Sequence, residues 1–123
     1  MKRNWDVVRE ILFTLEDLKP TEALSLNGFD ESRHYDISYH VKMLGDAGLL
    51  VVEFFHELSE QPSNFYATEL TWAGHEFLDS VREKNTWDKV KALIKEKGGV
   101  MTFDVIKTTA TTVASTLIKA SIS

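Results

Sequence analysis

Apolar residues recur at helical spacing in the first and last thirds of the chain, whereas the middle third carries short, nearly continuous apolar runs. The first helical pattern predicts a helix over Trp5–Leu18 with Asn4 as its N-cap. Lys19 ends it, because the residue before Pro20 is pushed out of the α region. A second pattern predicts a helix over about Asp36–Ala47 that stops at the following glycine.

The apolar runs of the middle third are rich in β-branched and aromatic residues, which favours strands. Leu49–Phe55 and Phe65–Leu70 are the two predicted strands, and the turn-rich segment Ser59–Asn64 joins them as a hairpin. Glu22–Leu26 alternates and predicts a short strand closed by a turn. Asp30–Tyr35 predicts a helical turn.

Helical spacing returns after the hairpin and predicts three more helices. The first is capped by Thr71, the second starts at Asn85 or Thr86 and ends at Gly98, and the last spans Thr102–Ala120. The three tryptophans of the chain are expected to be core anchors: Trp5, Trp72 and Trp87.

Helices followed by a two-stranded hairpin are typical of an α+β winged helix-turn-helix with a two-stranded wing, here with a helical C-terminal extension. The wing is Leu49–Leu70 and the recognition helix is Asp36–Ala47. The first helix of the motif has to fit within Asp30–Tyr35. We expect residues 1–85 to form the winged-helix domain and residues 86–123 an extension, packed on that domain or on a second copy.

Composition narrows the class of protein. The 123 residues are 43% hydrophobic and 27% charged, which fits one globular domain. The absence of cysteine excludes disulfides, thiolate zinc sites and cysteine nucleophiles. No apolar run approaches the roughly 20 residues that cross a bilayer, and no apolar segment follows Lys2 and Arg3 as in a secretory signal. We therefore expect a cytoplasmic protein that makes no use of a membrane.

Catalytic and cofactor motifs are missing from the sequence. The glycines lack the spacing of a phosphate-binding loop, and there is no Gly-x-Ser-x-Gly elbow. The helical zinc motif needs a second histidine one turn after His75-Glu76, and that position is Asp79. We expect no enzymatic activity, no cofactor and no metal site.

Double-stranded DNA is one expected partner. A helix fits the major groove, where tyrosine, serine and lysine side chains can bond phosphates and base edges. The face of Asp36–Ala47 opposite its apolar stripe, with the residues just ahead of it, carries such side chains. The candidate DNA-binding residues are Arg33, Tyr35, Ser38, Tyr39 and Lys42. This hypothesis makes the protein a transcriptional regulator.

A protein partner is the alternative, because the charge of the middle of the chain is unfavourable for DNA. The sequence has 14 Lys and Arg against 19 Asp and Glu, and no Lys or Arg lies between Lys42 and Arg82. Phosphate neutralisation dominates DNA affinity. The candidate partner-binding residues of this alternative are Glu53, Glu57 and Glu60 in the wing. Winged-helix folds do not by themselves fix a function.

A homodimer through residues 102–123 is a further expectation. The last predicted helix has an apolar stripe flanked by five threonines, which gives it weak intrinsic helix propensity, so packing has to stabilise it. That packing is either on its own domain or on a second copy.

Several motifs resemble known bacterial proteins. Ser38–Leu50 resembles the end of the recognition helix and the first wing strand of winged-helix regulators, and Leu70–Leu78 resembles their Leu-Thr-x-x-Gly entry into the next helix. With the opening Lys2-Arg3-Asn4-Trp5-Asp6, the whole chain is similar to the bacterial and phage family called domain of unknown function 2513. The resemblance implies a winged-helix-like fold and a bacterial or phage source.

Overall fold

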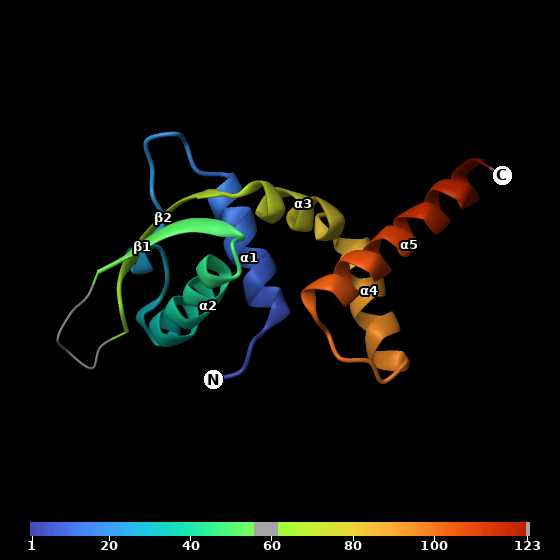
Figure 1. Cartoon of the computed structure of the whole chain (residues 1–123), viewed down its shortest axis with the longest axis horizontal. Coiled ribbons are helices and arrows are strands. Elements are labelled where there is room, and N and C mark those ends of the chain that lie inside the picture. Colours follow the sequence, from blue (N-terminus) through green and yellow to red (C-terminus); the bar gives the residue numbers. More distant parts are fainter. Residues whose placement is uncertain (56–61, 123) are drawn as a thin grey trace. The chain divides into compact units, whose positions relative to one another are not determined.

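The computed structural model describes residues 1–55 and 62–122, and over these ranges it contains five α-helices and a two-stranded antiparallel sheet (Figure 1). The α+β class predicted from the sequence is confirmed. The elements are α1 (Trp5–Glu16), α2 (His34–Asp46), β1 (Leu50–Phe54), β2 (Phe65–Leu70), α3 (Trp72–Val81), α4 (Lys84–Glu96) and α5 (Phe103–Ile122). Packing divides the chain into two compact units, which we call unit 1 (residues 1–75) and unit 2 (residues 76–123).

The helix α1 begins at the predicted cap. The Asn4 side chain accepts hydrogen bonds from the backbone N–H groups of Asp6 and Val7, at 2.9 and 3.4 Å. The helix ends at Glu16, two residues earlier than expected, because the Leu18 N–H bonds the Leu15 carbonyl in a tighter turn ahead of the proline.

The segment between α1 and α2 is less regular than predicted. The expected strand Glu22–Leu26 is reduced to one bridge, in which Leu24 and Ala67 exchange two backbone hydrogen bonds of 2.8 and 2.9 Å. The chain then enters a 3₁₀ turn, because the Leu26 N–H donates to the Asn64 side chain at 3.1 Å instead of continuing a ladder. The expected helix over 30–35 is a single 3₁₀ turn, Glu31–Arg33, that runs directly into α2.

The end of α2 is set by Gly48, as the sequence predicts. Its φ of +78° is accessible to glycine at little cost. The N–H groups of Gly48 and Leu49 bond the carbonyls of Gly45 and Leu44 at 3.0 and 2.9 Å, which is a Schellman cap.

The hairpin alternates between a buried and an exposed face. Phe65 and Ala67 are buried on β2, whereas the intervening Tyr66 is exposed. The register pairs Val51 with Glu69 and then Val52 with Ala67, so β2 carries a one-residue bulge. The helix α1 packs on β2 and α2 packs on β1, and the core of unit 1 lies between these helices and the sheet.

Thr71 and Gly74 explain the Leu-Thr-x-x-Gly motif that follows the hairpin. The Thr71 hydroxyl donates to the Gly48 carbonyl at 2.5 Å and accepts from the Gly74 N–H at 3.1 Å. A Cβ on Gly74 would lie 2.0 Å from the Leu49 carbonyl oxygen, so only glycine fits. The expectation that all three tryptophans are core anchors is wrong for Trp72, which is 80% exposed at the start of α3.

Unit 2 holds the remainder of α3 together with α4 and α5, so the three predicted helices are confirmed. The Phe77 and Phe103 rings stack with centroids 4.9 Å apart. The helix α4 begins at Lys84, one or two residues before the prediction, because the Glu83 side chain caps it. Within the described ranges, no helix combines the length and the apolarity that a bilayer crossing requires.

Candidate functional site

The exposed face of α2 carries most of the residues predicted to contact DNA. At about 100° per residue, positions 35, 39, 42 and 46 share one side of the helix, opposite the buried Ile37, Val41 and Leu44. Tyr35 is 56% exposed, Tyr39 is half-buried and Lys42 is exposed. Three of the five predicted DNA-binding residues therefore lie together on the expected face.

The Arg33 side chain is bound to Glu10 of α1. Its guanidinium donates two hydrogen bonds to the Glu10 carboxylate, at 2.9 and 2.6 Å. These bonds hold the pKa of Glu10 below its ordinary value and raise the pKa of Arg33. The pair connects the start of α2 to α1 and neutralises the cation nearest the N-terminus of α2.

The prediction that Ser38 lies on the exposed face is wrong. Ser38 is 8% exposed, and its hydroxyl donates to the Ser63 carbonyl at 2.8 Å. Position 38 lies on the edge of α2 that turns toward the hairpin, two turns before the close approach of Gly45 to Val52. Ser38 thus ties α2 to the segment that enters β2.

Lys42 also has an internal counterion. Its ammonium lies 3.1 Å from the Asp46 carboxylate one turn later on α2, and both side chains are well exposed. The predicted face therefore presents a paired lysine and two tyrosines. It does not offer a cluster of uncompensated cations.

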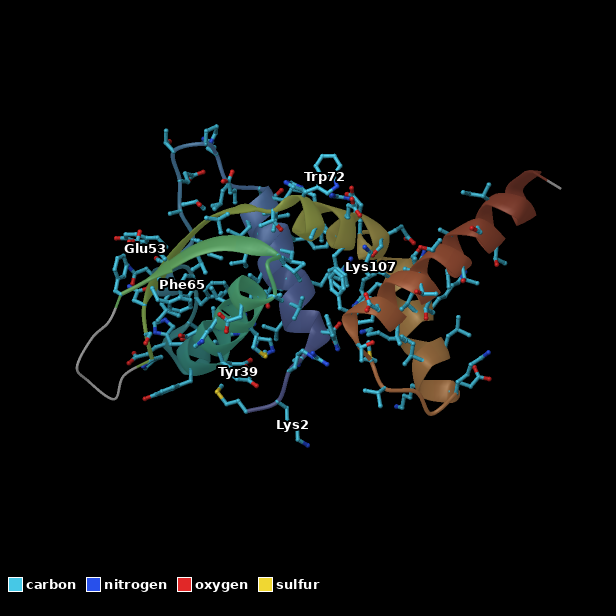
Figure 2. The ribbon with its side chains drawn as sticks, viewed as in Figure 1. Lys2, Tyr39, Glu53, Phe65, Trp72 and Lys107 are labelled. Carbon is cyan, nitrogen blue, oxygen red and sulfur yellow. The ribbon has the colours of Figure 1, made fainter. Side chains whose placement is uncertain are left out.

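A groove runs along α2 and β1, which contact each other at Gly45 and Val52. Its volume is about 940 Å³. Figure 2 shows Tyr39 on α2 and Glu53 toward the far end of β1, and both residues line it. The α2 side adds Lys42 and Asp46, and the β1 side supplies its five consecutive residues: Leu50, Val51, Val52, Glu53 and Phe54.

The acidic residues predicted to bind a partner divide into two groups. Glu53 is exposed on β1 and borders the groove. Glu57 and Glu60 lie outside the described residues. The groove itself was not predicted from the sequence. Gly45 lets Val52 approach α2 closely, since a Cβ at position 45 would come 2.7 Å from Val52 Cγ1, but a single glycine does not indicate a groove.

His40 has a structural position in the core of unit 1. It is fully buried; its Nε2 accepts from the Asn4 N–H at 2.8 Å, and its Nδ1 lies 2.8 Å from the Asp36 carbonyl. Because Nε2 accepts, the proton resides on Nδ1, and the ring is neutral. His40 thereby links α2 to the N-terminus of α1.

Residues 1–55 and 62–122 contain no group of three His, Asp or Glu side chains close enough together to hold a metal ion. Asp79, the position of the missing second histidine, instead forms an ion pair with Arg82 at 2.8 Å.

Comparisons with known proteins show the family. The family model described as "Hypothetical protein (DUF2513)" matches residues 2–100. A Haemophilus influenzae protein named "Uncharacterized protein" is 38% identical over 119 residues, which are 96% of this chain and 99% of that relative. No solved structure matches the chain. The chain therefore belongs to the DUF2513 family, as its opening, wing and Leu-Thr-x-x-Gly motifs indicate.

Proposed function

We propose that unit 1 is a winged-helix module of the cytoplasm that binds another protein and does not bind DNA. The observation that carries the proposal is the pairing of its two best-placed cations, Arg33 with Glu10 and Lys42 with Asp46. The proposal assigns no catalytic activity and no cofactor to the chain.

The winged-helix assignment rests on the order of elements in unit 1. The helix α1 is followed by the Leu24 bridge, then α2, then the β1–β2 hairpin. The bridge adds a third, one-residue edge to the sheet on the far side of β2. A single 3₁₀ turn, Glu31–Arg33, stands where a helix-turn-helix has its first helix. We therefore propose a modified form of the motif. The predicted domain boundary after residue 85 stays a prediction.

The negative charge of unit 1 is the main reason to propose a protein partner rather than DNA. Residues 1–75 contain 6 Lys and Arg against 13 Asp and Glu, a formal charge of −7. DNA affinity depends on the number of phosphates that cations neutralise. A unit with this charge repels the duplex. Arg33 and Lys42 are each paired with a carboxylate of unit 1, so the exposed face of α2 has little positive charge to offset that repulsion.

The lining of the groove favours a protein partner. Val51 is 45% exposed, and the half-buried Tyr39 and Phe54 add aromatic surface on the two walls. Aromatic and aliphatic side chains flanked by charged ones are typical of protein-binding surfaces.

Site-specific photo-crosslinking in the cells of origin tests the proposal. A photoreactive side chain at Val51 should crosslink to a protein, whereas the same group at Val105, exposed in unit 2, should not give that product. Glu53→Gln should weaken the Val51 product and Glu69→Gln should leave it unchanged. Crosslinks from Val51 to nucleic acid would contradict the proposal.

Sequence-specific DNA binding is the second candidate, and one observation favours it. Tyr35, Tyr39 and Lys42 lie on one face of the helix directly before the hairpin. If this face reads DNA, Lys42→Ala and Tyr39→Ala should each weaken specific binding by roughly 1–3 kcal/mol. The log–log salt slope should be shallow, on the order of −2 to −4, because few phosphates are neutralised.

A further inference from the structure

The strand β1 has an open edge in the part of the chain that the structure describes. β2 pairs with β1 on one side and with Leu24 on the other, so β2 is central and β1 is an edge strand. The five residues of β1 span about 17 Å. Edge strands present backbone groups that can pair with an added strand.

The backbone hydrogen bonds at both ends of β1 show which groups face that edge. The Phe55 N–H bonds the Asn64 carbonyl at 2.9 Å, and the Leu49 carbonyl accepts from the Thr71 N–H at 3.1 Å. Odd-numbered residues therefore turn their backbone groups toward β2. Because the direction alternates along a strand and the bulge lies on β2, the N–H and C=O groups of Leu50, Val52 and Phe54 point outward.

The groove follows this edge. Side chains of a strand alternate between its two faces, yet all five consecutive residues of β1 line the groove. A cavity over one face would touch only alternate residues, so the groove runs along the edge itself. Its second wall is α2, so the groove lies between a helix and a strand edge.

The negative charge beside the groove indicates which kind of segment would bind there. Glu53 is exposed on the outer face of β1, where a residue of an added strand would stand directly beside it. Opposite charges in such cross-strand pairs are stabilising and like charges are destabilising. With 6 cations against 13 anions in unit 1, the surrounding field also attracts a basic segment.

We infer that the groove binds an extended, basic segment of a partner protein as an added strand along β1. This inference rests on the proposed function and specifies its mode. The segment alternates apolar residues, which face α2 beside Val52 and Phe54, with Lys or Arg on the side of Glu53. The partner supplies main-chain hydrogen bonds to the outward groups of Leu50, Val52 and Phe54.

An NMR titration of the full-length chain with a blocked octapeptide of alternating valine and lysine tests the inference. We expect the amides of Val52 and Phe54 to shift and to gain protection from hydrogen exchange. The same peptide with glutamate in place of lysine should bind at least about tenfold more weakly. A version N-methylated at its valines should give no protection, because the methyl groups replace the N–H donors on the peptide edge that meets β1 and keep its backbone from approaching the strand.

Three protein variants complete the test. Glu53→Lys should weaken the valine–lysine peptide roughly tenfold, whereas Glu69→Lys, the matched exposed position on β2, should change its affinity less than about twofold. Val52→Pro removes an outward N–H without touching the ladder to β2 and should abolish protection at Phe54.

The inference is overturned if the peptide leaves the β1 amides unprotected at millimolar concentration, or if Glu53→Lys and Glu69→Lys act alike. If the chain binds neither DNA nor this peptide, the strand-addition inference is wrong and the broader proposal of a protein partner stands. If DNA shifts the amide signals of α2, both the inference and the proposed function are wrong.

Discussion

Unit 1 and unit 2 differ most in charge. Residues 1–75 carry 6 Lys and Arg against 13 Asp and Glu, whereas residues 76–123 carry 8 against 6. The acidic charge is therefore concentrated in the unit that contains α2, the helix expected to contact DNA. The whole-chain charge of −5 conceals this, because the basic residues of unit 2 offset part of it. The position of the charge, rather than its total, is therefore the property that bears on the choice between the two proposed partners.

The units also differ in how their polar side chains are used. Unit 1 has long-range bonds such as Asn4 to His40 and Arg33 to Glu10, which connect separate elements. In α5 of unit 2, the hydroxyls of Thr111, Thr112 and Thr116 bond carbonyls one turn earlier in the same helix. The threonine-rich face of α5 is thus satisfied locally, and apolar packing on α4 stabilises the helix.

The largest expected effect separates the two units. Ile106→Ala removes a fully buried side chain from unit 2 and should cost about 4 kcal/mol. In native-state hydrogen exchange, amides of α4 and α5 should lose protection first, while those of α1, α2 and β2 keep theirs. Ile118→Ala, at a 58% exposed site in the same helix, is the control and should have little effect. Equal loss in both units would show that they unfold as one.

Gly74→Ala tests the close approach within unit 1. The added Cβ would meet the Leu49 carbonyl oxygen, so we expect a loss of about 3 kcal/mol in urea unfolding. Gly28→Ala is the matched control, because its Cβ would make an ordinary 3.6 Å contact with Leu24. Similar stabilities for the two variants would mean that the start of α3 does not pack against Leu49 as described.

His40→Ala tests the long-range bonding of unit 1. The variant removes a fully buried ring and leaves the Asn4 N–H without its acceptor, so it should cost about 2 kcal/mol. The amides at the start of α1 should exchange faster, although His40 lies on α2. His75→Ala, at an exposed position, should unfold like the unaltered chain. No change at α1 in the His40 variant would contradict the link.

The smallest effect concerns Arg33 and Glu10. Both side chains are more than one third exposed, so solvent screening limits the pair to about 0.5 kcal/mol. Because the folded-state pKa of Glu10 is lowered, this contribution is complete above the ordinary value near 4.5 and is lost as pH falls through the lowered pKa. Glu10→Gln should remove that pH dependence from the urea midpoint. A contribution that grows with acidification would be inconsistent with the pair.

Local sequence signals predicted the elements but not the site. Asn4 and Gly48 act within a few residues of their own position, as does the Thr71 hydroxyl where it accepts from the Gly74 N–H. The structure has the helix ends that these residues indicate. The burial of Ser38 and the ion pair of Arg33 have no local signal, because their partners, Ser63 and Glu10, are 25 and 23 residues away. The strand expected at Glu22–Leu26 is shorter in the structure, also because of a distant partner: the Leu26 N–H donates to the Asn64 side chain. The groove depends on two elements at once and has no local signature.

The prediction of a homodimer through residues 102–123 stays a prediction. The first half of the apolar stripe of α5 is buried within its own chain at Ile106, Ala110 and Val113. Ile118 continues the helix at a 58% exposed position. Sedimentation of the full-length chain at high micromolar concentration distinguishes a dimer from a monomer.

The most direct test of the central claim is retention of a random-sequence duplex pool by the full-length chain at low and at moderate salt. The account predicts no retention at either salt concentration, because unit 1 carries 13 anions against 6 cations. Retention at low salt that selects a motif, and that Lys42→Ala and Tyr39→Ala weaken, would contradict the account and establish α2 as a DNA-reading helix.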